Sequence, residues 1–177
     1  HYIKEVLNGN KNAFAFLVDK YKNMLFTLAF RVVKNESLAE EIAQQAFIKA
    51  YTKLNTFRMD AAFSSWLYRI AYNTAITELR KKERMPEVFQ DDFNDHNNEY
   101  ETEPETTEAK SLLVHEAIDR LPKDEAVIIT LYYFEELPVK EMAKILNMTT
   151  SNIKIKLFRA RKKLEENLQK KLEETYI

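Results

Sequence analysis

The segment 152–164 carries hydrogen-bonding and cationic side chains at the spacing of one helical face. Its apolar residues recur at steps of four, three and four, and they are Ile153, Leu157, Ala160 and Leu164. This stripe should face a core. The side chains rotated away from it are Asn152, Ile155, Lys156, Arg159, Lys162 and Lys163. Asn suits adenine, Arg and Lys suit guanine or phosphate, and an apolar side chain suits the thymine methyl. The outer face therefore predicts contact with duplex DNA, whereas a purely solvated amphipathic helix is the alternative.

A second chemical grouping lies between residues 57 and 80, where aromatic and cationic side chains are interleaved. Its aromatic members are Phe57, Phe63, Trp66, Tyr68 and Tyr72, and its polar and cationic members are Arg58, Arg69, Asn73, Thr77 and Arg80. Aromatic faces on which bases can stack, together with cations that hold the backbone, are typical of single-stranded DNA binding. The helical spacing of Phe63, Trp66 and Ile70 favours a core role for those three. The better candidates for DNA contact are Arg58, Tyr68, Asn73 and Thr77.

Three helices must position the aromatic and cationic grouping between residues 57 and 80. Apolar periodicity predicts helices over about 12–33 and 62–83. Ser37 and Glu40 have the spacing of a capping box, which predicts a further helix that runs to Leu54. The cluster of cations at the end of the third helix suits a helix C-terminus, and Pro86 predicts a stop.

Four helices must position the cationic face near the C-terminus. The pattern predicts helices over about 108–120, 123–134, 138–146 and 151–175, with Pro122 and Pro138 suited to helix starts. A tight turn over 147–150 separates the last two. A short helix, a turn of three or four residues and a longer basic helix form the helix-turn-helix pattern, which favours DNA contact over the solvated alternative.

Charge is segregated along the chain although the net charge is only −1. Residues 1–85 hold 14 Lys/Arg against 8 Asp/Glu, and residues 109–177 hold 13 against 11. Residues 86–108 hold no Lys or Arg and 9 Asp/Glu, with no apolar period. We therefore expect an all-α chain of two small helical domains, 1–85 and 109–177, joined by a flexible acidic linker over 86–108.

Composition excludes several classes of function. A single glycine, Gly9, excludes glycine-rich phosphate loops, and the lack of cysteine excludes disulfide and thiolate chemistry. The three histidines, His1, His96 and His115, have no metal-ligand spacing. No catalytic constellation, metal site or cofactor is expected. Neither a signal peptide nor a membrane span is expected, and a cytoplasmic location fits the absence of cysteine.

Three segments together resemble the extracytoplasmic-function group of bacterial sigma factors. FRMDAAFSSWLYRIAYNTAITELRKKER at 57–84 is similar to the strand-separating segment of that family. SLAEEIAQQAFIKAYTKL at 37–54 resembles its polymerase-binding helix, and LPKDEAVIITLYYFEELPVKEMAKILNMTTSNIKIKLFRARKKLEENL at 121–168 resembles its C-terminal domain. The resemblance covers nearly the whole chain, in order.

The resemblance implies that the first domain docks on core RNA polymerase and opens promoter DNA. Its second helix would bind the clamp coiled coil of the β′ subunit through Glu40, Glu41, Gln44 and Gln45. The loop at 57–62 and the following helix would read and melt the minus-ten element, with capture of a flipped base. The residues expected there are Arg58, Asp60, Tyr68, Arg69, Asn73, Thr77 and Arg80.

The resemblance also implies that the second domain binds the β flap and reads the minus-thirty-five element as duplex. The residues expected at that element are Asn152, Lys154, Ile155, Lys156, Phe158, Arg159 and Lys162. The acidic linker would thread the RNA exit region as a mimic of nucleic acid. An anti-sigma partner is the family-level expectation, because both domains would expose apolar and basic surfaces that need masking.

Four positions depart from the family pattern. The family usually carries Asp at the position of Leu38 and Glu at Gln45, so two charges of the docking face are absent. Ile155 replaces a small polar residue on the reading face, and Met59 replaces a glycine in the loop. The last two substitutions predict an altered promoter preference.

Two other classes of protein remain as alternatives. An ordinary transcription factor would use its helix-turn-helix on duplex operator DNA as a two-fold dimer, and the aromatic–basic stretch would then have no purpose. A helical scaffold that binds only proteins is permitted by the acidic linker, but the basic helical face disfavours it.

Overall fold

The fold is described from a computed structural model, which describes residues 1–59, 62–84 and 107–175. All the regular structure within those ranges is helical, which confirms the expected all-α class. The elements are α1 (Tyr2–Leu7), α2 (Ala13–Val33), α3 (Glu36–Thr52), the 3-10 turn η1 (Leu54–Thr56), α4 (Phe63–Arg84), α5 (Thr107–Asp119), α6 (Lys123–Tyr133), α7 (Val139–Leu146) and α8 (Thr150–Thr175). Residues 86–106 of the predicted acidic linker lie outside the described residues, and its last two, 107 and 108, belong to α5.

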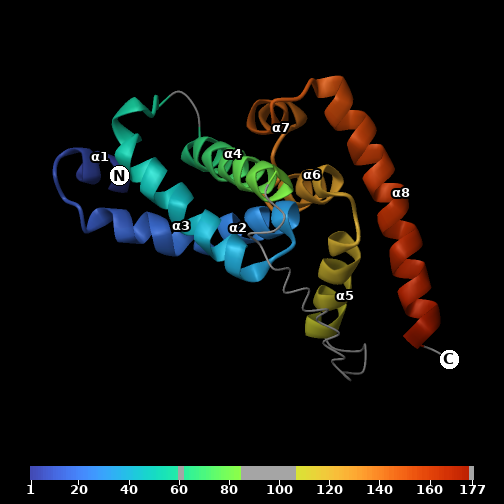
Figure 1. The fold of residues 1–177 in the computed structure, drawn as a ribbon. Helices are drawn as coiled ribbons and strands as arrows, with labels where there is room; N and C mark the ends of the chain where they lie inside the picture. Colours follow the sequence, from blue (N-terminus) through green and yellow to red (C-terminus); the bar gives the residue numbers. More distant parts are fainter. Residues whose placement is uncertain (60–61, 85–106, 176–177) are drawn as a thin grey trace. The chain divides into compact units, whose positions relative to one another are not determined.

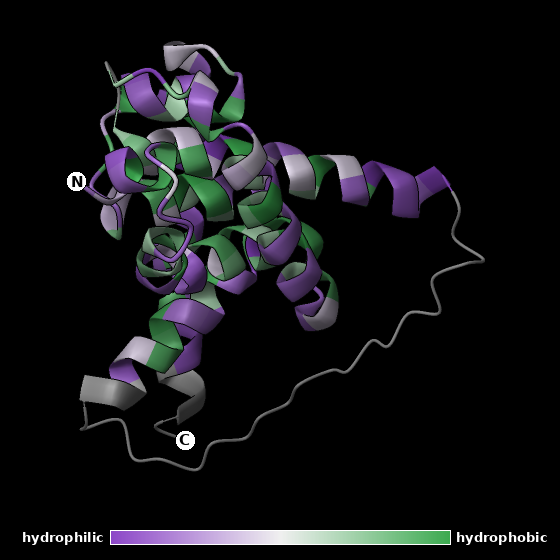
Figure 2. Ribbon diagram, turned by 90° about the vertical axis from the view of Figure 1, so that its left-hand side faces the viewer, coloured by the Kyte–Doolittle hydropathy of each residue, from purple (hydrophilic) through white to green (hydrophobic). Residues whose placement is uncertain are grey.

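The helices fall into two compact units (Figure 1). Figure 2 shows hydrophobic and hydrophilic residues alternating along the helices, as expected where each helix turns one side to a core. The first unit holds α1 to α4 together with residues 143–148, and the second holds α5, α6, the first turn of α7, and α8.

The core of the first unit is built by α2, α3 and α4, which pack against one another. Completely buried side chains come from all three, among them Leu25 and Leu28 of α2, Ile42 of α3 and Leu67 of α4. Because α4 packs on two helices at once, it buries a wide arc of its surface. That arc includes Tyr68, which is 1% exposed. The six-residue α1, which periodicity did not predict, packs on α2 through a stack of Tyr2 on Phe16 at 4.8 Å between ring centroids.

The connection between α2 and α3 is two residues long and differs from the predicted capping box. Lys34 ends α2 in the left-handed conformation (φ 53°), and its N–H donates to the carbonyl of Phe30. Asn35 is then extended, and its side-chain oxygen accepts the N–H of Leu38 at 2.8 Å. The prediction that Ser37 and Glu40 cap this helix was therefore wrong. An Asn in extended conformation before the first helical residue is an equally good cap.

The second unit is built around α6, whose middle residues from Ala126 to Leu131 are all buried. Helix α8 packs on both α6 and α5. Pro122 is the N-cap of α6, in agreement with the predicted start. Between α7 and α8, Asn147 adopts the left-handed conformation (φ 53°) and Met148 N–H donates to the carbonyl of Ala143 at 3.0 Å. The short helix, turn and long helix predicted from the sequence are confirmed.

Candidate nucleic-acid and polymerase interfaces

Helix α8 presents the cationic face that the sequence predicts. Ile153, Leu157 and Ala160 are buried, which fixes the rotation of the helix. Its start is capped by Thr149, whose hydroxyl accepts the N–H of Asn152 at 3.2 Å. The expected DNA-contacting residues that lie exposed on the outer face are Asn152, Lys154, Ile155, Phe158, Arg159 and Lys162. Six of the seven expected residues of this helix therefore share one accessible surface.

The seventh, Lys156, is turned toward α6 and only partly exposed. Its Nζ lies 2.9 Å from the Asp124 carboxylate, and both side chains keep 26% of their surface accessible. Lys156 therefore forms an ion pair within the protein and does not lie on the exposed outer face of α8, contrary to the prediction. Lys156 lies about 100° around the helix from Ile155, at the border of the side of α8 that packs on α6, and Asp124 of α6 is therefore within its reach.

Two further lysines bind α8 to its neighbours. Lys163 Nζ lies 2.9 Å from Glu125 Oε2, and Lys171 pairs with Glu116 of α5. Partly exposed pairs of this kind each contribute at most about 1 kcal/mol to stability, so their main effect is to orient the paired lysines toward α5 and α6. None of these three pairs could be predicted from the sequence, because the partners are 32, 38 and 55 residues apart and no local pattern links them.

An arginine on α8 also binds the end of α6. Arg161 Nε donates to the Tyr133 hydroxyl at 2.8 Å. Its guanidinium carbon lies 5.2 Å from the ring centroid of Tyr132 and 5.6 Å from that of Tyr133, within the range of cation–π attraction. Arg161 is thereby oriented away from the outer face of α8.

Helix α4 presents a separate polar and cationic face. Arg69, Asn73, Thr77 and Arg80 are all exposed, and their spacing of four, four and three places them on one side of the helix. Thr77 donates its hydroxyl hydrogen to the carbonyl of Asn73 at 2.8 Å, so the Thr77 oxygen remains able to accept. The side-chain amide of Asn73 offers both a donor and an acceptor. This face can hold a phosphate backbone and hydrogen-bond to a base.

The aromatic residues between 57 and 68 form a cluster that supports the start of α4. Phe57 lies 5.5 Å from Phe63 and 5.3 Å from Trp66, ring centroid to ring centroid. Phe63 is buried and Trp66 is half-buried, which agrees with the core role expected for both. Tyr21 of α2 closes the cluster from the other side, at 5.7 Å from Phe63.

Tyr68 was expected to contact DNA, and that prediction is wrong for this structure. The ring is 1% exposed and meets Tyr21 edge-on at 6.2 Å. Arg58, in the loop before α4, is exposed, as is Met59 at 56%. Asp60, also expected at this site, lies outside the described residues. The accessible candidates in this unit are therefore Arg58 and the four residues of the α4 face.

The four residues expected to bind polymerase share the outer side of α3. Glu40, Glu41 and Gln44 are exposed and Gln45 is half-buried. Gln45 Nε2 donates to Glu41 Oε1 at 2.9 Å, which orients both side chains along the helix. The α3 face is thus acidic and amide-rich, in contrast to the cationic face of α4.

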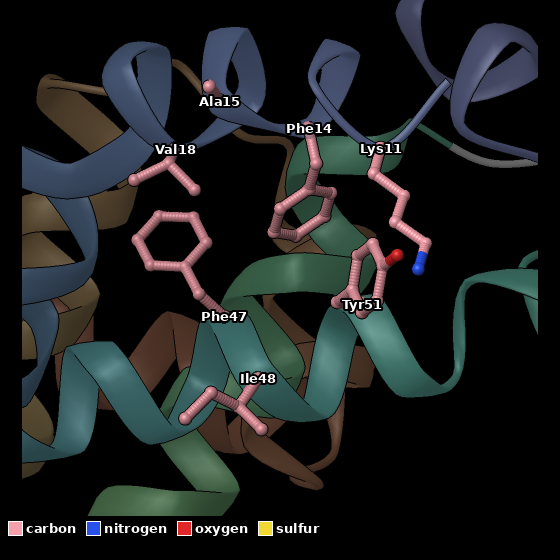
Figure 3. Close-up of a pocket in the computed structure, with 7 residues that line it drawn as sticks. All are labelled: Lys11, Phe14, Ala15, Val18, Phe47, Ile48 and Tyr51. Carbon is pink, nitrogen blue, oxygen red and sulfur yellow. The ribbon is translucent and has the colours of Figure 1, made fainter. Parts of the chain in front are cut away.

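An apolar groove continues from the end of this α3 face toward the start of α2 (Figure 3). Its volume is about 360 Å³. Phe14 points into it and meets Tyr51 edge-on at 5.1 Å, while Ile48 lies at its rim with 66% of its surface exposed. Sequence reasoning missed this groove because Phe14 and Ile48 are distant in the chain.

Comparison with known proteins assigns both units to one family. Residues 17–85 match the model of sigma-70 region 2, and residues 111–164 match that of sigma-70 region 4. The chain is 34% identical to the RNA polymerase sigma-H factor of Pseudomonas aeruginosa, with 97% of this chain and 94% of the relative covered. It is also 34% identical to the ECF RNA polymerase sigma factor SigW of Bacillus subtilis, with 94% and 95% covered.

Solved structures show the same fold. A complex of the sigma factor RpoE with the anti-sigma factor NepR from Bartonella quintana contains a chain that matches with a TM-score of 0.70 and 23% identity, over 88% of this chain and 96% of that one. CnrH in complex with the cytosolic domain of CnrY matches with a TM-score of 0.64 and 21% identity, over 95% of each chain.

The chain therefore belongs to the sigma-70 family of bacterial RNA polymerase sigma factors, in the extracytoplasmic-function group. It is a transcription initiation factor rather than an enzyme, and it directs promoter recognition. Among the described residues, no helix is both long and apolar enough to span a membrane.

Proposed function

We propose that the two units divide promoter recognition between them. Residues 1–85 dock on polymerase and open the minus-ten element, and residues 109–177 read the minus-thirty-five element as duplex, with residues 86–108 as the tether. The observation that carries this proposal is the pair of separate cationic helix faces, one on α4 and one on α8. The α4 face lies beside an aromatic cluster, which suits single-stranded DNA, and the α8 face follows a helix-turn-helix, which suits the major groove.

The residues proposed for each contact follow from their exposure. The residues proposed to read duplex DNA are Asn152, Lys154, Ile155, Phe158, Arg159 and Lys162. The residues proposed to take part in strand opening are Arg58, Arg69, Asn73, Thr77 and Arg80. The N-terminal part of α8 is the part that meets base edges, because a recognition helix enters the groove by its N-terminal residues.

Docking on core polymerase is assigned to the α3 face. Glu40, Glu41, Gln44 and Gln45 would meet the β′ clamp coiled coil, and the second unit would meet the β flap. The acidic charge and fixed amides of α3 support this assignment, because a face of that kind complements a basic helical partner. A cytoplasmic location follows from this role, since core polymerase and promoter DNA are there.

An anti-sigma protein is the proposed regulatory partner. The RpoE chain that shares this fold was solved bound to the anti-sigma factor NepR, which supports the same arrangement here. A partner that co-purifies with the tagged factor from its own host and suppresses transcription by it would establish this role. Failure to find any inhibitory partner there would reject it.

Run-off transcription tests the proposed function directly. Purified factor is added to bacterial core polymerase with a pool of promoter-like fragments from the host. We expect specific transcripts that require the factor. Binding of the factor to operator DNA by itself, with no response from core polymerase, would instead favour an ordinary regulator.

A charge reversal separates docking from folding. Glu41→Lys on the α3 face should abolish factor-dependent transcription and weaken the complex with core polymerase. Asp19→Lys is the matched control, because Asp19 is an exposed carboxylate of the same unit that lies on α2 rather than on α3. Equal loss in both variants would reject the assignment of docking to α3.

A further inference from the structure

The outward centre of the α8 face is apolar, although its surroundings are basic. At about 100° per residue, Ile155 lies almost opposite the buried stripe of Ile153, Leu157 and Ala160. It therefore points almost directly away from the core, and 51% of its surface is exposed. A large aliphatic side chain at that position buries only part of its apolar surface within the chain, so a partner that covers it would gain the free energy of burying the rest.

Phe158 extends this apolar centre by one turn. It lies about 60° around the helix from Ile155 and is 70% exposed, the largest value among the exposed large hydrophobic residues of the described chain. The cations Lys154, Arg159 and Lys162 are also exposed and surround the pair. Lys156, the residue next to Ile155, is held at the border by Asp124 and so leaves the centre uncharged.

A rim of cations around an apolar pair fits one surface of duplex DNA. The phosphates bind the rim, and the only apolar group that base pairs present in the major groove is the C5 methyl of thymine. We infer that Ile155 and Phe158 form a thymine-methyl contact site, so that the upstream element of this factor's promoters carries thymines at two fixed positions. This inference rests on the proposed duplex reading by α8 and specifies which base chemistry that reading uses.

The helix geometry sets the spacing of the two thymines. Side chains three residues apart on a helix lie about 5–6 Å apart at Cβ. Successive base pairs are separated by about 3.4 Å along the DNA axis. The two methyl groups should therefore belong to adjacent base pairs or to pairs separated by one, on either strand.

Removal of single methyl groups from the DNA tests the inference at the level of atoms. Holoenzyme is assembled from the full-length factor and core polymerase, and its preferred upstream element is selected from a randomised pool. Each thymine in that element is then replaced by deoxyuridine, which removes the C5 methyl but keeps every hydrogen-bonding group. We expect about a fourfold loss of binding at each of two positions, the effect of burying one methyl-sized group, and no loss elsewhere.

Variants of the protein assign each methyl to its side chain. Ile155→Ala should remove the sensitivity to deoxyuridine at one position and Phe158→Ala at the other, while Ile155→Leu should retain it. Lys154→Ala is the matched control, and it should weaken the thymine and the deoxyuridine duplexes equally. Because Ile155 and Phe158 are both exposed, the alanine variants should keep the melting temperature of the wild type. An unchanged melting temperature separates loss of the DNA contact from loss of the fold.

Two outcomes would overturn the inference. Replacement of every thymine without loss of binding would do so, and so would an Ile155→Ala variant that keeps the full sensitivity to methyl removal. In either case transcription by the wild-type holoenzyme would still support the proposed function. A factor that gives no promoter-specific transcription at all would instead reject the proposed function itself.

Discussion

The cationic faces of α4 and α8 are held in place by different forces. Helix α4 is fixed by apolar and aromatic packing, and it buries a wide arc against α2 and α3. Helix α8 is fixed on one side by Ile153, Leu157 and Ala160, and at its edges by lysines paired with carboxylates on α5 and α6. The α4 face is thus backed by a packed core, whereas the border of the α8 face depends on charge pairs that salt screens.

The two faces also differ in what they offer to DNA. The α4 face mixes arginines with the neutral hydrogen-bonding groups of Asn73 and Thr77, beside a half-buried Trp66. The α8 face has an apolar centre with a cationic rim. The first composition suits bases removed from the stack, and the second suits the methyl-bearing edge of a closed duplex. Variants that affect one face and not the other sharpen this contrast.

The largest effect is expected from the buried ring that supports the α4 face. Tyr68→Ala should lower the free energy of unfolding by about 3–5 kcal/mol, because it leaves a cavity between α4 and α2. The neighbouring Arg69→Ala is the control, and it should change that energy by no more than about 0.5 kcal/mol while still weakening strand opening. Urea unfolding measures the free energy of unfolding of both variants. A stable Tyr68→Ala protein that fails only in strand opening would return Tyr68 to the DNA-contacting set.

The next effect is expected on the α8 face. Arg159→Ala should weaken recognition of the upstream element by about 1–3 kcal/mol if Arg159 contacts a base, with loss of preference at one base pair. The measurement is holoenzyme binding to a set of single-base variants of that element. A uniform loss across all variants would mean that Arg159 holds only phosphate.

A smaller effect is expected for the amide on α4. Asn73→Ala should reduce strand opening by about 1 kcal/mol, the value of one lost hydrogen bond, with little change in binding to core polymerase. Permanganate reactivity of unpaired thymines reports the opening. Asn23→Ala, an exposed amide on α2 of the same unit, is the control. Equal losses of opening and polymerase binding would indicate misfolding instead.

The smallest effect concerns the border of the α8 face. Asp124→Asn should release Lys156 toward the phosphates and make the slope of log affinity against log salt more negative by about 0.9. Lys156→Ala should leave the slope of the wild type unchanged, because Asp124 already holds that lysine. If Lys156→Ala alone flattened the slope by the same amount, Lys156 would contact DNA despite its ion pair. A protein whose affinity is insensitive to salt would contradict DNA binding by this unit altogether.

Most helices of this fold can be predicted from the sequence, because each turns one periodic apolar stripe to a core. Helix α7 and the start of α8 follow from the pattern around Pro138 and the turn at Asn147. The short α1 could not be predicted, since its stabilising contact is the stack of Tyr2 on Phe16 of another helix. The cap at Asn35 could have been found, because Asn there is as good a cap as Ser37.

Fewer of the site residues than of the helices could be predicted from the sequence. The exposed faces of α4 and α8 follow from spacing alone, since a residue opposite the apolar stripe is exposed. Tyr68 was assigned to the outside because the sequence suggests one narrow stripe, whereas α4 packs on two helices and buries more. The ion pair of Lys156 with Asp124 joins residues 32 apart, and only the tertiary fold brings them together.

Replacing a left-handed residue at a helix end by glycine is a way to raise the melting temperature of this protein. Glu136 follows α6 with φ 51°, in a chain that has a single glycine elsewhere. The left-handed conformation costs a non-glycine residue about 1–2 kcal/mol, and glycine avoids this cost. Glycine loses more backbone entropy on folding, which offsets about 0.5–1 kcal/mol of that gain. Glu136→Gly should therefore raise the melting temperature by a few degrees, as measured by calorimetry, without altering either DNA face. A single substitution outside the residues proposed to contact DNA or polymerase would thus give a protein that tolerates higher temperatures during purification and assay.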